Sequence, residues 1–314
     1  MRTLLSGKSL RFKSKPACTA TFGVFDGLHR GHLHILKKVV TRAGKRGLKS
    51  LLVSLSPHPL HFYNKEFAGY IITQEEKIRL LKRLGLDYFW IVKFNKKVAK
   101  MDGARFLQHV LRYFNVKNII VAEDFKFGYR AGNTISDLKR ICRKRGIAVE
   151  EIKKKKIKKR IISSSLIRRL IKEQNFKEAK LFLGRDYSVG SKVKKGGSIG
   201  KKYLNAPTVN LDVDNKVLPG RGVYITKTKH KKKIYESISN LGISPTFGKK
   251  KIGLESHILN FHKSIYKDFV QVFFIKKIRP ERRFSTLKDL KDQIDKDKTI
   301  AEKFFSSCRF RILG

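Results

Sequence analysis

The sequence predicts an α/β protein of two domains: an N-terminal domain with a Rossmann-like parallel sheet, and a C-terminal small antiparallel β-barrel that ends in a helix. In the first half, apolar runs alternate with helical patterns, which is typical of a parallel sheet covered on both faces. From about Tyr187 onward, short β-rich runs separated by Gly, Pro and Asn indicate a small barrel. The 314 residues suffice for two hydrophobic cores, and we place the domains at 1–184 and 185–314.

The elements of the first domain follow from apolar runs and helical periodicity. The strands are expected at Ala17–Val24, Ser50–Leu55, Tyr88–Val92, Asn118–Val121 and Ala148–Glu151. The helices are expected at His32–Gly44, Thr73–Leu84, Asp102–Tyr113 and Thr134–Arg145, with two more at Ser163–Glu173 and Phe176–Leu183. Ligands of such folds bind beyond the carboxyl ends of the strands, so the loops at those ends are the candidate site.

The second domain is expected to consist of short strands and a final helix. The strands are expected at Ser188–Val193, Thr208–Leu211, Gly222–Thr226, Lys233–Asn240, Leu254–Leu259 and Phe269–Ile275. The helix is expected from Thr286 to about Phe305, because Leu287, Leu290 and Ile294 share one helical face. Strands of this length and spacing predict antiparallel pairing rather than further βαβ units.

The net charge of +48 is extreme, and it comes mostly from lysines spread along the whole chain. Such a charge attracts nucleic acid, anionic membranes or phosphate-rich ligands. A lysine-rich codon bias produces the same distribution, so we expect no specific nucleic-acid partner. No run approaches the ~18 apolar residues of a membrane helix, and Cys18, Cys142 and Cys308 lack metal or disulfide spacing. These features predict a cytoplasmic location and no membrane partner; they leave the oligomeric state open.

The segment from Gly23 to His32 carries the strongest chemical signal. It joins the first expected strand to the first expected helix, so free backbone N–H groups and the positive end of the helix dipole meet there. Gly27 and Gly31 let the backbone approach an anion closely. The imidazoles of His29 and His32 can donate hydrogen bonds to phosphoryl oxygens as charge develops on them. Two histidines alone would indicate an ordinary turn, but the whole segment predicts a phosphate site.

Two loops at other strand ends add candidate residues. Pro57 and His58 follow the second expected strand, where the prolines fix a rigid turn. Asp124 follows the fourth expected strand, where a carboxylate can bind a ribose or magnesium. Taken singly, the first loop is better explained as an ordinary connection, and the second is only a weak signal of a site.

A third candidate segment opens the helix expected at 163–173. Ser164 and Ser165 can cap this helix and bind phosphate through their hydroxyl and backbone N–H groups. Arg168 can bind a triphosphate with two parallel hydrogen bonds. The run of basic residues at 153–160, just upstream, is usually a solvated face, although here it could also raise the local concentration of a phosphate-bearing ligand.

The second domain offers a separate set of oxygen donors. Thr208 and Asn210 lie two apart on an expected strand and therefore point to the same face. Both carry hard oxygen ligands suited to Mg²⁺. The preceding Gly- and Lys-rich loop, which contains Gly200 and Lys202, can hold phosphate groups through its backbone. On chemistry alone, a plain strand with an edge proline is the preferred explanation of these residues.

The first-domain motifs resemble those of the bacterial bifunctional riboflavin kinase/FAD synthetase family. Residues 29–32 are similar to the His-x-Gly-His signature of nucleotidylyltransferases, and residues 25–27 are similar to the Phe-Asp-Gly of the FAD synthetase half. Residues 57–59 and 123–128 resemble two further family loops. Residues 163–168 resemble the family's Ser-Ser-Thr-x-Ile-Arg loop that closes over ATP.

The second domain resembles the riboflavin kinase module of the same family. Residues 207–210 resemble its Pro-Thr-Ala-Asn motif, residues 218–224 its Leu-Pro-x-x-Gly-Val-Tyr motif, and residues 240–247 its Asn-x-Gly-x-x-Pro-Thr-Phe motif. Glu255 stands at the place of the family's catalytic glutamate, which implies a general base for the 5′-hydroxyl of riboflavin. Arg279 continues the pattern and is implied to lie near the flavin.

The resemblance thus implies a complete set of site residues. The implied catalytic residues are His29, His32 and Glu255, and the implied metal ligands are Thr208 and Asn210. The residues implied to bind nucleotide or flavin are Gly23, Phe25, Asp26, Gly31, Pro57, His58, Asp124, Ser164, Ser165, Arg168, Gly200, Lys202 and Arg279. The chain departs from the family pattern at Ala122, Asn205, Ala206 and Asn260.

The function implied is ATP-dependent phosphorylation of riboflavin to FMN, followed by adenylylation of FMN to FAD with release of pyrophosphate. Mg²⁺ is the expected cofactor, ATP the co-substrate, and riboflavin and FMN the small-molecule partners. Three alternatives remain at this point: an FAD synthetase with a decayed kinase half, another adenylyl- or cytidylyltransferase, and a basic RNA-binding protein on a retired enzyme scaffold.

Overall fold

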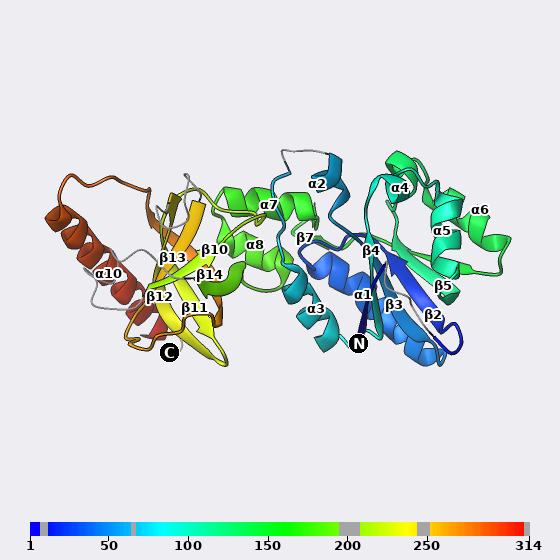
Figure 1. The fold of residues 1–314 in the computed structure, drawn as a ribbon, viewed down its shortest axis with the longest axis horizontal. Coiled ribbons are helices and arrows are strands. Elements are labelled where there is room, and N and C mark those ends of the chain that lie inside the picture. The colour runs from blue at the N-terminus through cyan, green and yellow to red at the C-terminus, as the bar shows by residue number, and fades with distance from the viewer. Residues whose placement is uncertain (7–11, 64–66, 195–207, 244–251, 311–314) are drawn as a thin grey trace. The chain divides into compact units, whose positions relative to one another are not determined.

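The computed structural model describes residues 1–6, 12–63, 67–194, 208–243 and 252–310. The chain divides into two compact units, Met1–Ser164 and Ser165–Gly314. Figure 1 shows the elements of each unit. The boundary that the sequence suggests, between residues 184 and 185, stays a prediction.

Six parallel strands form the sheet of the first unit, in the spatial order β1-β4-β3-β2-β5-β6. They span Arg2–Leu5 (β1), Ala17–Phe22 (β2), Lys49–Ser56 (β3), Tyr88–Lys93 (β4), Asn115–Ala122 (β5) and Ala148–Ile152 (β6). On one side of β2 the chain proceeds outward through β3 and β4, and on the other side through β5 and β6. The strand order therefore reverses at β2, and α/β folds bind their ligands in the crevice at that point.

Helices cover both faces of this sheet (Figure 1). One face carries α1 and α3, and the other carries α5 and α6; they span Arg30–Lys45 (α1), Gln74–Arg83 (α3), Gly103–Leu111 (α5) and Ile135–Arg143 (α6). Successive residues of β3 serve opposite cores: Leu51 and Val53 pack toward α5 and α6, whereas Leu52 packs toward α1 and α3. Because both faces are buried, the strands read as nearly continuous apolar runs.

Several short elements of the first unit escaped the sequence prediction. β1 is an edge strand whose Leu4 is buried, but its four residues are too few to show a pattern. The other unpredicted elements are α2 (Pro59–Tyr63), α4 (Lys96–Ala99), a 3₁₀ turn at Tyr129–Ala131, and a hairpin formed by β7 (Lys156–Ile157) and β8 (Arg160–Ile161). The hairpin turns at Lys158 and Lys159, both with positive φ, so it lacks the Asn-Gly signal that predicts such turns.

The second unit contains a closed barrel of six antiparallel strands in the order β10-β13-β12-β11-β14-β9, with β9 also paired to β10. They span Ser188–Lys194 (β9), Thr208–Asp212 (β10), Gly222–His230 (β11), Lys233–Ile243 (β12), Ile252–Ile258 (β13) and Phe269–Arg279 (β14). Five hydroxyl residues from β11, β12 and β13 are fully buried and bonded to one another: Thr226, Thr228, Ser237, Ser239 and Ser256. Mutual hydrogen bonds make this polar burial tolerable.

Among the described residues, three helices accompany the barrel strands: α7 (Ser164–Lys172), α8 (Phe176–Leu183) and α10 (Leu287–Phe310). The Phe176 ring of α8 stacks on Phe274 of β14, with centroids 5.6 Å apart. Ala301 and Phe305 of α10 pack with Val223 on the outer face of the barrel. Helices α8 and α10 thus both pack on the closed barrel.

The predicted fold class is confirmed: a parallel α/β sheet, a small antiparallel barrel and a terminal helix. The helix α8 has the bounds predicted from the sequence, whereas β11, β12 and β14 extend beyond the predicted ends. In the part of the chain that the structure describes, no helix has the length and apolar character needed to cross a membrane.

Candidate active sites

The turn after β2 has an unusual backbone. Gly23 has a φ of 151°, and a Cβ there would stand 2.9 Å from the Phe25 ring. Phe25 and Leu28 have φ values of 51° and 39°, in the left-handed region that side chains other than glycine rarely adopt. The turn therefore holds the Phe25 ring against the backbone and directs the chain into α1.

His29 and His32 form a stacked pair at the start of α1. His29 is the N-cap residue, and its Nδ1 accepts a hydrogen bond from the His32 backbone N–H over 3.1 Å. The two rings lie 3.5 Å apart between centroids and 15° from parallel. A Cβ on Gly31 would come within 3.2 Å of the His29 ring. The glycine between the histidines therefore makes room for the stacked arrangement.

A cavity of about 760 Å³ opens beside this turn, within the first unit. Thr21 and Phe22 of β2, Leu55 of β3 and Ala122 of β5 line it, so it lies at the carboxyl ends of the strands, where their order reverses. The turn contributes Gly23, Val24 and Phe25, and α1 contributes His32. Its walls are mainly apolar and aromatic, which suits a flat ring system next to a polar turn.

The loop after β5 supplies a further part of the cavity wall. The Phe125 and Phe127 rings stack at 5.5 Å between centroids, and both line the cavity. Asp124 also lines the cavity and forms an ion pair with the Lys154 Nζ over 2.5 Å. The Lys154 backbone N–H donates to Glu123 over 3.0 Å. These two bonds hold Lys154, which precedes the β7–β8 hairpin, against the cavity wall.

Asp26 has a structural role in addition to its predicted one. The side chain is buried, and its carboxylate accepts hydrogen bonds from the backbone N–H groups of Ile71 and Ile72, at 3.1 to 3.4 Å. The Ser164 hydroxyl donates to the Asp26 carbonyl over 2.9 Å. Asp26 therefore fastens the turn to two segments far away in the sequence.

Pro57 and His58 lie next to the cavity, between β3 and α2. The next two residues, Pro59 and Leu60, line it. The His58 backbone N–H donates to the Tyr70 hydroxyl over 3.0 Å, and His58 Nδ1 accepts from the Leu60 backbone N–H over 3.1 Å. These bonds fix the loop at the rim of the cavity.

The serine–arginine segment falls at the division between the two units. Ser164 belongs to the first unit, whereas Ser165 and Arg168 belong to the second. The Arg168 side chain is buried in α7. Binding of ATP phosphates by these three residues stays a prediction.

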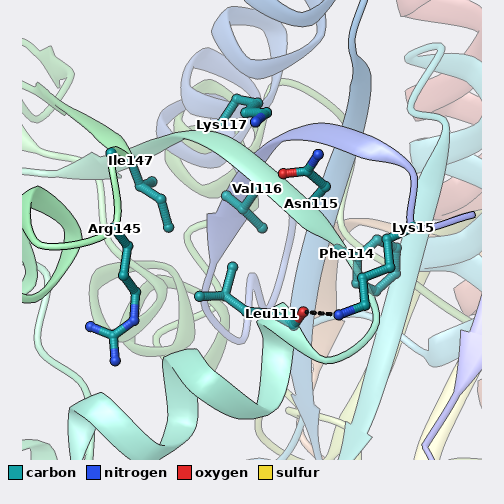
Figure 2. Close-up of a pocket in the computed structure, with 9 residues that line it drawn as sticks. Lys15, Leu111, Phe114, Asn115, Val116, Lys117, Arg145 and Ile147 are labelled. Atoms are coloured by element: carbon teal, nitrogen blue, oxygen red, sulfur yellow. Dashed lines mark hydrogen bonds between the residues drawn. The ribbon is translucent and has the colours of Figure 1, made fainter.

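A second cavity of the first unit, of about 470 Å³, lies at the amino ends of β5 and β6 (Figure 2). Two of its three cationic side chains bind the last turns of helices. Lys15 donates to the Leu111 carbonyl of α5 over 3.2 Å, and Arg145 donates to the Ile141 carbonyl of α6 over 3.0 Å. Cations stabilise helix C-termini, so these residues have a structural explanation.

Polar residues of the barrel form a row across three strands. In the register, Asn210 of β10 pairs with Glu255 of β13, and Glu255 pairs with Asn240 of β12. Directly opposite residues in an antiparallel sheet share a face, with Cβ atoms ~5 Å apart. The next row on that face joins Thr208 to His257. The structure therefore places the predicted Thr208, Asn210 and Glu255 together.

The same face fits a magnesium ion. The Asn210 Oδ1 is buried and has no hydrogen-bond partner among the described residues. A buried amide oxygen without a partner is costly unless a ligand satisfies it. No group of three or more His, Cys, Asp or Glu side chains in the described ranges could hold a metal. Mg²⁺ usually binds to few protein ligands together with phosphates, and binding of this ion by Thr208 and Asn210 stays a prediction.

Asn240 and His257 were not among the predicted site residues. Asn240 belongs to the motif at residues 240–247, for which the resemblance implies no site residue, and His257 stands two residues after Glu255. Burial, with a smaller effect of the Lys298 charge, lowers the pKa of His257 to about 4. The alternation of side chains along β13 could have indicated His257, because residues two apart on a strand point to the same face and Glu255 is two residues away.

The Arg279 side chain is hydrogen-bonded to another side chain of the protein. Its guanidinium donates to the buried carboxylate of Asp297 through Nε and Nη2, at 2.8 to 3.0 Å. Gln293 donates to the same carboxylate over 3.0 Å. These bonds join the end of β14 to α10. A flavin contact by Arg279 stays a prediction. The predicted phosphate residues Gly200 and Lys202, and the departures Asn205 and Ala206, lie outside the described residues.

Together these features define a class of protein: an enzyme that transfers phosphorus-containing groups, with a histidine-bearing α/β cavity in one unit and a carboxylate–amide row on a barrel in the other. The chain belongs to the bifunctional riboflavin kinase/FMN adenylyltransferase family. The FAD synthetase family model matches residues 11–166, and the riboflavin kinase family model matches residues 183–305.

Relatives and a solved structure agree over nearly the whole length. A bifunctional riboflavin kinase/FMN adenylyltransferase of Buchnera aphidicola subsp. Schizaphis graminum is 34% identical, over 91% of this chain and 93% of the relative. The Bacillus subtilis enzyme of the same name is 30% identical, over 91% and 92%. A crystal structure described as a macrolide-efflux protein of Streptococcus pneumoniae superposes with a TM-score of 0.81, at 26% identity, and covers 96% of this chain and 98% of that one.

Proposed function

We propose that the barrel unit phosphorylates riboflavin to FMN and that the α/β unit adenylylates FMN to FAD, each with ATP. The observation that carries the kinase half is the row formed by Asn210, Glu255 and Asn240. The observation that carries the adenylyl-transfer half is the stacked pair of His29 and His32 beside a cavity at the sheet's reversal point.

In the kinase step, Glu255 accepts the proton of the riboflavin 5′-hydroxyl as that oxygen attacks the γ-phosphorus of ATP. ADP leaves. Thr208 and Asn210 would hold Mg²⁺, which would supply neutralisation of charge on the phosphates. Asn240, beside Glu255 in the row, orients the carboxylate toward the hydroxyl. Arg279 supports the flavin side through its bond to α10.

In the adenylyl-transfer step, an FMN phosphate oxygen attacks the α-phosphorus of ATP, and pyrophosphate leaves. No side chain needs to form a covalent bond, so the protein contributes position and charge stabilisation. His32 donates to the reacting phosphate, and His29 keeps the His32 ring in place by stacking and by capping α1. The aromatic walls, with Phe25 and Phe125, hold the flavin ring. Gly23 and Gly31 permit close approach, and Ser164, Ser165 and Arg168 bind the leaving pyrophosphate.

The decisive assay supplies riboflavin and MgATP to the purified chain and separates the flavins by chromatography. The proposal requires FMN to appear first and FAD to follow. FAD from supplied FMN, without any FMN from riboflavin, would instead show a decayed kinase half. Absence of both products together with tight RNA binding would favour the retired-scaffold alternative.

A further inference from the structure

A lysine lies behind the catalytic turn of the α/β unit. Lys77 of α3 is 6% exposed, and its Nζ donates to the Val24 carbonyl over 2.9 Å. Val24 lines the cavity and stands between Gly23 and Phe25 of the turn. A buried ammonium group is expensive unless it is well bonded, so a lysine at this place calls for an explanation.

The turn needs external support to keep its shape. Phe25 and Leu28 both have positive φ, a conformation that persists only where the surroundings enforce it. Two donors converge on one carbonyl inside this turn: the Val24 oxygen accepts from Lys77 Nζ and also from Ser54 Oγ, over 3.1 Å. The neighbouring Asp26 is held separately, by backbone N–H groups of Ile71 and Ile72.

The chemistry of an ammonium donor suits this task. A hydrogen bond from a charged donor is roughly twice as strong as a neutral one. Burial lowers the pKa of Lys77 to about 8, and the opposing influence of Asp26 limits that change. The group is therefore still mainly protonated at neutral pH. Its charge stands directly behind the carbonyl that fixes the position of Phe25.

We propose that Lys77 is a positioning residue for adenylyl transfer: it holds the Val24 carbonyl, and so the turn that presents Phe25 and His32 to the substrates. This role rests on the proposed function of the cavity. Lys77 acts through the turn and contacts no substrate. Loss of its donor should allow the turn to relax, so that the substrates still bind but react slowly, because an error of ~1 Å in position can cost ~100-fold in rate.

The test compares Lys77→Met, which keeps the length but removes the donor, with Lys82→Met at an exposed position of the same helix. We expect Lys77→Met to lower kcat for FAD formation from FMN by ~10- to 100-fold, with KM values for FMN and ATP within about twofold. Lys82→Met should match the wild type. FMN formation from riboflavin should be unchanged in both variants, which checks that the rest of the chain is intact.

Hydrogen exchange measured by mass spectrometry gives a readout independent of activity. The proposal requires faster exchange in peptides covering residues 23–28 of Lys77→Met, with no such change in Lys82→Met. Wild-type kcat together with wild-type exchange in Lys77→Met would overturn the role of Lys77. A wild-type chain that makes no FAD from FMN would overturn the proposed function instead.

A second variant covers the case in which Lys77→Met does not fold. Ser54→Ala removes the other donor to the Val24 carbonyl and leaves the ammonium in place. The proposal then requires a several-fold lower kcat for FAD formation and faster exchange in residues 23–28, with the kinase rate unchanged. An unaltered kcat and unaltered exchange in Ser54→Ala would refute the importance of this carbonyl.

Discussion

The imidazole rings of His29 and His32 lie face to face, with centroids 3.5 Å apart, and His29 at the same time caps the helix that carries His32. One histidine thus sets the position of the other. Because His32 lines the cavity, it is the member of the pair that can reach a substrate.

Replacement of His32 by alanine should lower FAD formation from FMN by at least ~100-fold, the usual scale for loss of one donor to a transition-state oxyanion. Steady-state assays with FMN and MgATP measure this. His34→Ala, at an exposed position of the same helix, is the control and should retain full activity. A His32→Ala rate within a few-fold of the wild type would contradict the role of this imidazole.

Glu255→Gln should abolish FMN formation from riboflavin and leave FAD formation from supplied FMN intact. The amide keeps the size of the side chain but cannot accept the proton of the 5′-hydroxyl, and loss of a general base typically costs 10²- to 10⁴-fold. Chromatography of both reactions gives the result. Glu302→Gln, exposed on α10, serves as the control. Persistent FMN formation in Glu255→Gln would place the base elsewhere.

Asn210→Ala should raise the Mg²⁺ concentration needed for half-maximal FMN formation about tenfold, which corresponds to loss of one neutral ligand worth ~1.4 kcal/mol. The physical reason is the Asn210 Oδ1, which is buried without a partner among the described residues. A magnesium titration of the kinase rate measures the change. Asn215→Gly, in an exposed turn, should leave the titration unaltered. The same Mg²⁺ requirement in Asn210→Ala would exclude this oxygen as a ligand.

The barrel should lose stability in acid partly through His257. Burial lowers its pKa to about 4 from an ordinary value of 6.5. Between these values the unfolded chain binds more protons than the folded one, so stability falls as pH decreases from 6.5 to 4. Calorimetry of the full chain across this range should show a smaller loss of Tm for His257→Gln than for the wild type. His262→Gln, at an exposed position, should follow the wild type, and equal losses in all three would show that His257 does not contribute.

Nonspecific RNA binding should depend on total charge rather than on one site. We expect weak binding that is lost between 50 and 200 mM salt, a range over which such contacts weaken ~10³-fold or more. Neutralising Lys156, Lys158 and Lys159 of one hairpin should lower RNA retention as much as neutralising Lys231, Lys232 and Lys233 of another. Retention that vanishes with only one triple substitution would reveal a dedicated RNA site.

The regular elements were predictable because their signals are local. Buried strands such as β3 show as apolar runs, and α8 shows as a helical pattern bounded by Asn175 and Gly184. β1 was missed, since it is stabilised by pairing with β4, more than eighty positions further along the chain. The cluster of buried hydroxyl side chains around Thr226 was missed for a similar reason, because its hydrogen bonds join residues of different strands.

For the candidate sites, too, some residues could be predicted from the sequence and others could not. Residue types and spacing indicated a phosphate site at His29 and His32, because few side chains can donate to phosphoryl oxygens at a helix start. The roles of Thr208, Asn210 and Glu255 came from the family resemblance, since residue chemistry alone explained them as ordinary strand positions. Residues that support them, such as Lys77, carry no signal of their own. Nothing in the order of the residues shows that a lysine of the third helix bonds to a carbonyl of the first turn.

The sequence by itself determined the two-domain fold class, most strands and helices, and the chemical identity of the candidate residues, since periodicity and turn chemistry depend on near neighbours. Only the tertiary structure decided which oxygen accepts from which donor. In the folded chain the Ile71 backbone N–H donates to the Asp26 carboxylate, and the Arg279 guanidinium donates to the Asp297 carboxylate. Asn210 lies opposite Glu255 in the barrel register. Those contacts depend on the register of strands and on how helices pack, which are settled only when distant segments fold together.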